Sequence, residues 1–358
     1  MFDPQNPSFS ICIPIYNHGA YIADTIQSVL NQTYQNFEIV IADNASTDNS
    51  VEVIERFNDP RIRLIRNRYN IGFAPNLQRV TMYAKNDFIN LLSSDDQMKP
   101  NALEVYAKVI SKMAPHVQNL VLFSKTEHFD NNNNVTYVTE KSPDSFYNQH
   151  IPATRSHETP ITGDDIEYQT YQGHAVLAES LAQLRTFAPF LSIAYSRSLW
   201  EAIEGYNAVR TIGPDKFFNY KLLFQNPVVV YVPHILYRYR EYASLNRATQ
   251  RLTLKQVIDD YLYTIEYKDA DLQPIGLSRQ RLINTFIDKV CLKQGLSELG
   301  RRNYFYGFSM FAFSMAAYPG VALRNSKFYM LMALLFTGPL ATRIAPLLLS
   351  WYHRGKED

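Results

Sequence analysis

The feature of this 358-residue chain that most constrains its fold is a series of short apolar runs that alternate with helical repeats. The runs are rich in β-branched residues, as in FSICIPIY at residues 9–16 and FEIVIA at residues 37–42, and polar turns close them. The stretches between them carry apolar residues at helical spacing, for example Ile22, Ile26 and Val29. Strands that alternate with helices predict right-handed βαβ units and a mostly parallel sheet covered on both faces.

Apolar runs typical of strands and apolar residues at helical spacing also occur beyond the first hundred residues. The cluster DNNNN at residues 130–134 is typical of a hairpin tip, and the polar residues 140–177 predict an inserted loop or flexible lid. Beyond Thr253 the period is helical nearly to the end. The predicted strands are residues 9–16, 37–42, 62–66, 88–92, 120–125, 190–195 and 228–232. The predicted helices are residues 20–32, 49–57, 75–84, 99–113, 197–205 and 216–224.

Charge and cysteine usage restrict the partners and the compartment. The formal net charge is +1, which excludes a broad nucleic-acid-binding surface, so we expect no nucleic-acid partner. Cys12 and Cys291 lie far apart and form no zinc-binding spacing, as in proteins of a reducing compartment. Residues 1–7 are polar and lack the basic and apolar parts of a signal peptide. We therefore expect a cytoplasmic protein.

Acidic residues follow two of the predicted strands directly. Asp43 comes after residues 37–42, and the pair Asp95 and Asp96 comes shortly after residues 88–92. In parallel sheets, ligands bind at the carboxyl ends of the strands, where these side chains are expected to lie. A carboxylate pair beside a buried strand costs desolvation energy unless a cation or a hydrogen-bond donor compensates it.

Five segments of the sequence form a pattern: SICIPIYN (10–17), IVIADNASTDNS (39–50), RNRYNIGFAPN (66–76), LLSSDD (91–96) and GPDKFFNYKLL (213–223). Together they resemble the family 2 glycosyltransferases of the GT-A fold, in family order and at family-like distances over roughly residues 8–246. The resemblance implies a Rossmann-like α/β domain over residues 1–246, with a mixed, mostly parallel sheet flanked by helices. A helical C-terminal region would follow over residues 247–358, and residues 140–177 would be an inserted loop on the acceptor side.

The resemblance also implies a role for individual positions. Asp43 matches the carboxylate that binds the nucleotide base, and Asp215 matches the catalytic base of inverting members. Asp95 and Asp96 match the motif that binds the metal and the sugar nucleotide, with Asp96 as the direct ligand. Pro14, Tyr16 and Asn17 match the loop that flanks the base, and Asn70, Gly72 and Asn76 match a loop beside the donor.

The chemistry of sugar transfer agrees with these residue types. A leaving nucleoside diphosphate needs charge stabilisation, which Mg²⁺ or Mn²⁺ supplies on hard oxygen ligands such as Asp96. A sugar hydroxyl is a poor nucleophile at neutral pH, and a carboxylate that takes its proton contributes about 10²–10⁴-fold to the rate. Direct displacement by that hydroxyl inverts the anomeric configuration. We therefore expect a divalent metal as cofactor and a nucleotide-sugar donor as partner.

The chain departs from the family pattern at three places. Ser93 stands where many members carry a further Asp, and Pro214 stands where many carry an acid before the base. Many members also place a His after a Tyr-Arg pair near the end of the domain. This chain has the sequence YRYREY at residues 237–242 instead, so we expect Arg238 or Arg240 to bind the diphosphate through the planar guanidinium.

Each of these assignments competes with an ordinary structural role. Asp43 could cap the helix that follows it, for which Asp48 is the better candidate. Asp95 and Asp96 could form a solvated turn, and Asp215 could cap the helix at residues 216–224. Arg238 and Arg240 could belong to an ordinary charged surface.

The end of the chain is apolar with basic flanks. Residues 328–340 and 345–352 are strongly apolar, but Gly338, Pro339, Arg343 and Pro346 interrupt them, which disfavours a membrane-spanning helix. We expect residues 324–356 to form a helical hairpin at the inner face of the cell membrane, in peripheral contact. A helix packed in the core and a true membrane span are the alternatives.

Three functions remain open from the sequence. The first is an inverting transferase that acts on a saccharide or lipid-linked saccharide in cell-surface polysaccharide or glycolipid synthesis. The second is a polyprenyl-phosphate sugar synthase, whose acceptor needs no base. The third is a non-catalytic module that binds a nucleotide sugar or polysaccharide. Sugar choice is expected to depend on pocket shape around residues 93–96 and 187–192.

Overall fold

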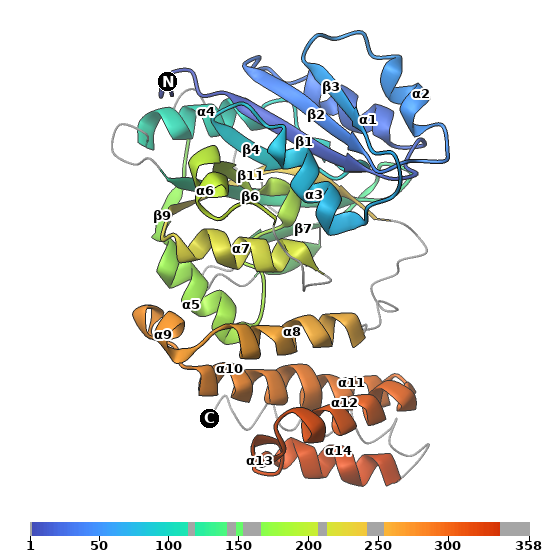
Figure 1. Cartoon of the computed structure of the whole chain (residues 1–358), viewed down its shortest axis with the longest axis vertical. Coiled ribbons are helices and arrows are strands. Elements are labelled where there is room, and N and C mark those ends of the chain that lie inside the picture. The colour runs from blue at the N-terminus through green and yellow to red at the C-terminus, as the bar shows by residue number, and fades with distance from the viewer. Residues whose placement is uncertain are drawn as a thin grey trace. The chain divides into compact units, whose positions relative to one another are not determined.

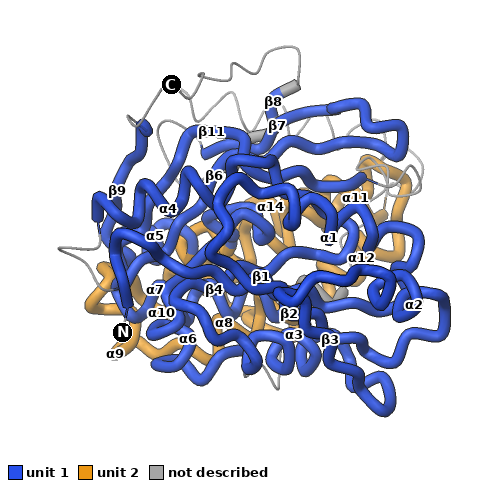
Figure 2. The backbone as a smooth tube through the Cα atoms, turned by 90° about the horizontal axis from the view of Figure 1, so that it is seen from above, with its two compact units in different colours: residues 1–180, 185–251 blue, residues 181–184, 252–358 orange. Residues whose placement is uncertain are grey.

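The computed structural model describes residues 2–113, 119–141, 148–152, 166–206, 213–241 and 254–336 (Figure 1). The chain forms two compact units, shown in blue and orange in Figure 2. The N-terminal unit comprises Met1–Ser180 and Arg185–Arg251, and the C-terminal unit comprises Leu181–Leu184 and Leu252–Asp358. The predicted domain boundary after Asn246 falls outside the described residues.

The N-terminal unit is built on a mixed sheet with the strand order β3-β2-β1-β4-β10-β6-β11-β5. Four of its pairings are parallel: β1 with β2 and β4, β2 with β3, and β6 with β11. The short strand β10 lies antiparallel between β4 and β6, and the pairings of β5, β7, β8 and β9 are also antiparallel. The predicted α/β class with a mixed sheet is confirmed.

The elements of this unit follow the predicted alternation through its first half (Figure 1). Its strands are β1 (Phe9–Ile15), β2 (Phe37–Asp43), β3 (Ile62–Arg66), β4 (Phe88–Leu91), β5 (Gln97–Met98), β6 (Leu120–Phe129), β7 (Val135–Lys141), β8 (Asn148–Pro152), β9 (Gln169–Gln172), β10 (Ala194–Ser196) and β11 (Val228–Arg240). Its helices are α1 (Ile22–Leu30), α2 (Ser50–Glu55), α3 (Phe73–Met82), α4 (Ala102–Met113), α5 (Gly173–Gln183, whose last residues belong to the C-terminal unit), α6 (Arg197–Ala202) and α7 (Pro214–Phe224).

Successive side chains of β1 point to opposite faces of the sheet, and both sets are buried under helices. Ile11 and Ile13 join a buried apolar cluster with residues of α1 and α4. The residue between them, Cys12, points the other way and lies 3.7 Å from the carbonyl oxygen of Val80 on α3. Side chains of successive strand residues lie on opposite faces, so a strand apolar at every position is buried from both sides.

Three predicted segments differ from the structure. Residues 190–195 do not form one strand, because the chain makes a 3₁₀ turn over Phe190–Ser192 before β10 begins. Strand β11 continues past residue 232 to Arg240, since an irregularity in its pairing with β6 accommodates Pro233. Residues 140–177 are not wholly irregular: β8, β9 and the start of α5 lie within them, whereas residues 142–147 and 153–165 lie outside the described part.

The C-terminal unit is helical, as predicted. Its helices are α8 (Leu254–Glu266), α9 (Asp269–Leu272), α10 (Arg279–Thr285), α11 (Gln294–Gly300), α12 (Tyr304–Ala317), α13 (Pro319–Ala322) and α14 (Ser326–Phe336), with a 3₁₀ turn at Gln273–Ile275. A π-helical segment, Phe286–Lys293, joins α10 to α11.

Helix α14 contains the first part of the segment predicted to lie at the membrane. Phe328, Leu331 and Leu334 are buried in the C-terminal unit, whereas Tyr329 and Phe336 are exposed. One face of this helix therefore packs in the protein, as the packed-helix alternative expects. Within the described residues no helix has the length and apolar character needed to span a membrane, and residues 337–358 lie outside that part.

Candidate active site

Residues at and after the carboxyl ends of β1, β2, β3 and β4 surround a cavity of about 550 Å³. We call it the donor-side cavity because residues predicted from the sequence to bind the donor line it. Tyr16 and Phe73 are exposed at 44% and 58%, so their rings present flat apolar surfaces to solvent. The cavity is lined by Pro14, Ile15, Tyr16, His18, Asn44, Asn70, Gly72, Phe73, Asn76, Ser93, Ser94, Asp95 and Phe190. Six of the predicted site residues thus line one cavity: Pro14, Tyr16, Asn70, Gly72, Asn76 and Asp95.

Asp43 and Asn17 hold the loop that follows β2. The Asp43 carboxylate is 2% exposed and accepts a hydrogen bond from the Ser46 backbone N–H, at 3.1 Å. Asn17 has a positive φ of 53°, and its side-chain oxygen accepts the Thr47 N–H at 2.8 Å. The expected capping residue Asp48 accepts N–H groups of Gly19 and Ser50. Both Asp43 and Asn17 lie outside the lining of the donor-side cavity.

Asn44 connects the loops after β2 and β3, a role that sequence reasoning missed. Its side-chain N–H₂ donates to the Asn70 side-chain oxygen at 2.9 Å and to the Gly72 carbonyl at 3.3 Å. Its side-chain oxygen accepts from the Asn67 side chain at 3.0 Å and from the Ile71 backbone at 2.9 Å. Four hydrogen bonds from one buried amide fix the wall of the donor-side cavity.

Asp96 stands just past β4 and is 1% exposed. Its Oδ1 accepts the Arg240 backbone N–H at 2.9 Å, while its buried Oδ2 has no hydrogen-bond partner among the described residues. Burial, with the charge of the neighbouring Asp95, raises the pKa of the Asp96 carboxyl well above its ordinary value. A buried carboxylate oxygen without a donor is the environment in which a bound cation would compensate the desolvation cost.

The two arginines of β11 differ in their contacts. The Arg240 side chain donates to the Asp95 carbonyl oxygen at 3.1 Å and to the Asp24 carboxylate at 3.2 Å, next to the Asp95–Asp96 pair. Arg238 is bound to Glu127 at 2.6 Å and to Gln97 at 2.7 Å. Neither arginine is among the residues that line the donor-side cavity or the second cavity, which is described next.

A second cavity of about 570 Å³, the acceptor-side cavity, adjoins the first. Ser93 and Phe190 line both cavities, so the two meet at these residues. Asp215 reaches the acceptor-side cavity from the first turn of α7, which Pro214 begins. The full lining is Ser93, Asp96, His128, Thr139, Arg185, Thr186, Ala188, Pro189, Phe190, Leu191, Asp215, Lys216, Asn219 and Tyr239.

His128 is a further wall residue that the sequence analysis did not identify. Its ring stacks on Tyr137 with centroids 4.1 Å apart, and its Nε2 is 2.8 Å from the Thr139 hydroxyl oxygen. It lies on β6 opposite Tyr239 of β11, so strand pairing brings both residues to the same cavity. A single histidine on an apolar strand carries no local signal for this position.

Parts of the chain are similar to known proteins. Residues 10–164 match the family described as glycosyl transferase family 2. This match covers less than half of the chain, and residues 10–164 are similar to that family. The chain is 38% identical over 108 residues to the glycosyltransferase GlyG of Streptococcus pneumoniae, which covers 29% of this chain and 36% of GlyG. It is 39% identical over 103 residues to WfgD of Escherichia coli, a UDP-Glc:α-D-GlcNAc-diphosphoundecaprenol β-1,3-glucosyltransferase, with 29% of this chain and 41% of WfgD covered.

These matches span less than half the length of either relative. Among solved structures, residues 1–349 of Staphylococcus aureus TarS in complex with UDP-GlcNAc are similar with a TM-score of 0.56. That similarity covers 97% of this chain and 92% of the TarS chain at 14% sequence identity. At this identity the likeness concerns the fold alone, and the fold is the GT-A fold that the sequence predicted.

Asp95 and Asp96 offer hard carboxylate oxygens of the kind that a divalent metal needs. No group of three His, Cys, Asp or Glu side chains converges within the described part of the chain. Asp95 and Asp96 are adjacent, however, and the buried Asp96 Oδ2 is a hard oxygen that accepts no described hydrogen bond. Mg²⁺ and similar ions are commonly bound by one or two carboxylates, with substrate phosphates and water completing the coordination. The residues therefore fit such an ion bound together with a diphosphate.

Proposed function

We propose that the chain is an inverting, metal-dependent glycosyltransferase. It would move a sugar from a nucleotide diphosphate sugar to a hydroxyl of a saccharide or lipid-linked saccharide, in cell-surface polysaccharide or glycolipid synthesis. The observation that supports this most is the pair of cavities that meet at Ser93 and Phe190. Asp95 lines the first cavity, and Asp96 and Asp215 line the second.

The donor-side cavity has the features needed to hold a nucleotide. Tyr16 offers an exposed ring on which a base can stack, and the asparagines fixed by Asn44 offer amide groups to the ribose and base. Asp95 and Asp96 would hold Mn²⁺ or Mg²⁺, which when bound stabilises the charge of the leaving diphosphate. We propose that Asp43 binds the nucleotide base, and its hydrogen bond to the Ser46 backbone also fixes the base-binding loop. Arg240 would support the diphosphate beside the carboxylate pair. For Arg238, phosphate binding stays a prediction from the sequence.

On the acceptor side, Asp215 is the group placed to take a proton. It lines the acceptor-side cavity from the start of α7, and Asp96 lines the same cavity. An acceptor hydroxyl in this cavity would give its proton to the Asp215 carboxylate as its oxygen attacks the anomeric carbon. The bond from that carbon to the diphosphate oxygen breaks on the opposite side, so the configuration inverts.

The two alternative functions predict different results from one assay. A polyprenyl-phosphate sugar synthase needs no base, and a binding module releases no nucleotide. The purified chain should be incubated with Mn²⁺ and a panel of UDP-, GDP- and dTDP-sugars, and released nucleotide measured. We expect release from one donor class, stimulated by metal and by a hydroxyl acceptor. Tight nucleotide binding without any release across the panel and a range of glycan acceptors would favour the binding module.

Thermal-shift screening with the same nucleotides identifies the donor independently of turnover. A ligand present at 100 times its dissociation constant raises the free energy of unfolding by about 2.7 kcal/mol. We expect one nucleotide to stabilise the protein more than the others, and the stabilisation to require metal.

We also propose peripheral contact with the inner face of the cell membrane through the C-terminal helices. Aromatic side chains are exposed on α12 and α14, with Phe305 at 68%, Phe308 at 59% and Phe336 at 87%. Exposed aromatic residues near basic ones are typical of helices at a bilayer interface. Because α14 packs in the C-terminal unit, a truncation should end after Phe336. Full-length protein is expected to co-sediment with anionic vesicles more than the truncated chain does, and full-length protein left wholly in the supernatant would contradict the proposal.

A further inference from the structure

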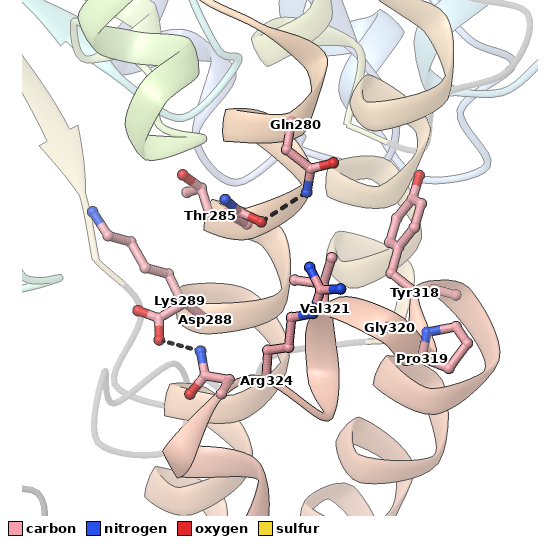
Figure 3. Close-up of a pocket in the computed structure, with 12 residues that line it drawn as sticks. Gln280, Thr285, Asp288, Lys289, Tyr318, Pro319, Gly320, Val321 and Arg324 are labelled. Atoms are coloured by element: carbon pink, nitrogen blue, oxygen red, sulfur yellow. Dashed lines mark hydrogen bonds between the residues drawn. The ribbon is translucent and has the colours of Figure 1, made fainter.

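The C-terminal unit contains a cavity of its own, of about 890 Å³, which we call the helical cavity (Figure 3). It opens between α10 with the following π-helical segment on one side and the turn from α12 to α13 on the other. Neither the fold nor the proposed transfer reaction requires a cavity at this place. It is lined by Gln280, Asn284, Thr285, Asp288, Lys289, Ala317, Tyr318, Pro319, Gly320, Val321, Arg324 and Asn325.

The π-helical segment Phe286–Lys293 forms part of the wall. Such segments are rare, and they occur frequently at functional sites. Here the segment places Asp288 and Lys289 in the lining. The Asp288 carboxylate is bound by the Lys327 ammonium at 2.7 Å and by the Asn325 side chain at 2.8 Å. Lys327 is 3% exposed, so this ion pair fixes the loop between α13 and α14 and balances the Asp288 charge.

With Asp288 balanced by Lys327, the remaining charges of the helical cavity are positive. The Arg324 guanidinium extends between the two walls (Figure 3), is exposed to solvent, and takes part in none of the ion pairs among the described residues. Lys289 adds a second cation, and its ammonium donates to the Gln183 side chain. A guanidinium at the mouth of a cavity suits a carboxylate or a phosphate, which it binds through two parallel hydrogen bonds.

The uncharged side chains that line the helical cavity suit the hydroxyl and C–H groups of a sugar ring. Gln280 and Asn284 are exposed one helical turn apart on α10, where their amides bond to each other at 3.0 Å. The Tyr318 ring stands at the opposite wall, and its hydroxyl is 2.7 Å from the Thr264 hydroxyl oxygen. Amides that donate and accept hydrogen bonds, next to an aromatic ring, match the hydroxyl edges and C–H faces of a pyranose.

We propose that the helical cavity binds a saccharide segment that carries an anionic group, a carboxylate or a phosphate, held by Arg324. This site is separate from both cavities of the N-terminal unit, and it deepens the proposed function because it assigns an acidic glycan to the enzyme. The amides of Gln280 and Asn284 bind the sugar hydroxyls, and Arg324 binds the anion.

Titration calorimetry on the full-length protein tests the proposal with three probes: trigalacturonate, phosphorylated maltotriose, and neutral maltotriose. Saturating Mn²⁺ and the nucleotide identified by the thermal-shift screen are present throughout, so that the donor-side cavity is occupied. We expect at least one anionic probe to bind at least tenfold more tightly than maltotriose, and the two anionic arms show whether carboxylate or phosphate is preferred. Equal binding of the neutral probe, or no binding of either anionic probe, would overturn the proposal.

Two variants connect that binding to the helical cavity. Arg324→Ala removes the guanidinium, and Gly320→Trp fills the cavity from a position where an added Cβ would meet no atom within 4 Å. Both should weaken binding of the anionic probe at least tenfold with an unchanged melting temperature. The matched control is Arg281→Ala, which removes an exposed arginine of α10 outside the lining and should bind like the unmodified protein.

Unchanged binding by both cavity variants would overturn the proposal, as would equal weakening by the control. Nucleotide release from the donor is measured on the same preparations without acceptor glycan, and Arg324→Ala should retain it. A failure of the binding site and a failure of the proposed transfer reaction are therefore distinguishable.

Discussion

The donor-side and acceptor-side cavities share two wall residues but are assembled in different ways. Apart from Phe190, the donor-side lining comes from residues 14–95, in loops that follow consecutive strands of the sheet. The acceptor-side lining comes from residues 93–239, through strand pairing and segments distant in sequence. The donor-side wall is also fixed by the Asn44 hydrogen bonds. We infer that donor binding depends on local structure and that acceptor binding depends on the tertiary arrangement.

The largest expected effect comes from a residue that serves both sides. Asp96→Ala removes the buried carboxylate that lies past β4 and lines the acceptor-side cavity. We expect metal-stimulated donor binding and transfer to fall together to background, because the diphosphate and the remaining carboxylate then lack the cation between them. Nucleotide titration with and without Mn²⁺ checks this, and metal-stimulated turnover that persists in the variant would refute the assignment.

Asn44→Ala should affect the donor side alone. The variant loses four hydrogen bonds, two of which leave the Asn67 and Ile71 donors without that partner, at a cost of about 1–3 kcal/mol. We expect nucleotide affinity to fall roughly tenfold, which corresponds to about 1.4 kcal/mol, while acceptor KM stays unchanged. Asn36→Ala, which removes one exposed hydrogen bond elsewhere in the unit, is the control. A change in acceptor KM of similar size would contradict the separation of the two cavities.

His128→Ala should affect the acceptor side alone. The substitution removes a ring that stacks on Tyr137 and a hydrogen bond to Thr139 in the wall of the acceptor-side cavity. A loss of about 1 kcal/mol predicts a rise in acceptor KM of roughly fivefold, with nucleotide affinity unchanged. Steady-state kinetics at saturating donor measure the acceptor KM. A loss of nucleotide affinity with an unchanged acceptor KM would contradict the assignment of His128 to acceptor binding.

The smallest expected effect concerns stability without ligands. Burial and the Asp95 charge raise the pKa of Asp96 in the folded protein, so this carboxyl lowers the free energy of unfolding at pH values above the ordinary pKa of an aspartate. Asp96→Asn should therefore raise the melting temperature of the metal-free protein by on the order of 2 °C at pH 7. The difference should disappear as pH falls toward the ordinary pKa of an aspartate, where the unmodified side chain is also neutral. A lower melting temperature for the variant at pH 7 would contradict this.

The sequence predicted the donor side better than the acceptor side for a physical reason. Strands such as Ile62–Arg66 and the loops after them are specified by neighbouring residues, so Tyr16, Asn70 and Asp95 could be placed from short motifs. Asp215 was found in the same way, at the start of a helix with Pro in its first turn. The outer strands β8 and β9 were missed because their mixed polar sequences lack the alternation of a half-buried strand.

Residues whose position depends on long-range pairing left no such signal. His128 and Tyr239 meet because β6 pairs with β11, and Phe190 reaches both cavities through a 3₁₀ turn where a strand was predicted. The four hydrogen bonds of Asn44 likewise depend on how the loops after β2 and β3 come together. Patterns of apolar residues specify strands and helices, but they do not encode which strands become neighbours.

The variant Asp215→Asn tests most directly whether donor binding and acceptor activation depend on different residues. The amide keeps the size of the side chain and cannot take a proton, so nucleotide affinity should stay within about twofold while kcat falls at least roughly a hundredfold. Both quantities are measured on one preparation, with the donor identified by the nucleotide screen and saturating metal. Turnover close to that of the unmodified protein would remove Asp215 from the mechanism, and a parallel loss of nucleotide affinity would contradict the separation of donor binding from acceptor activation.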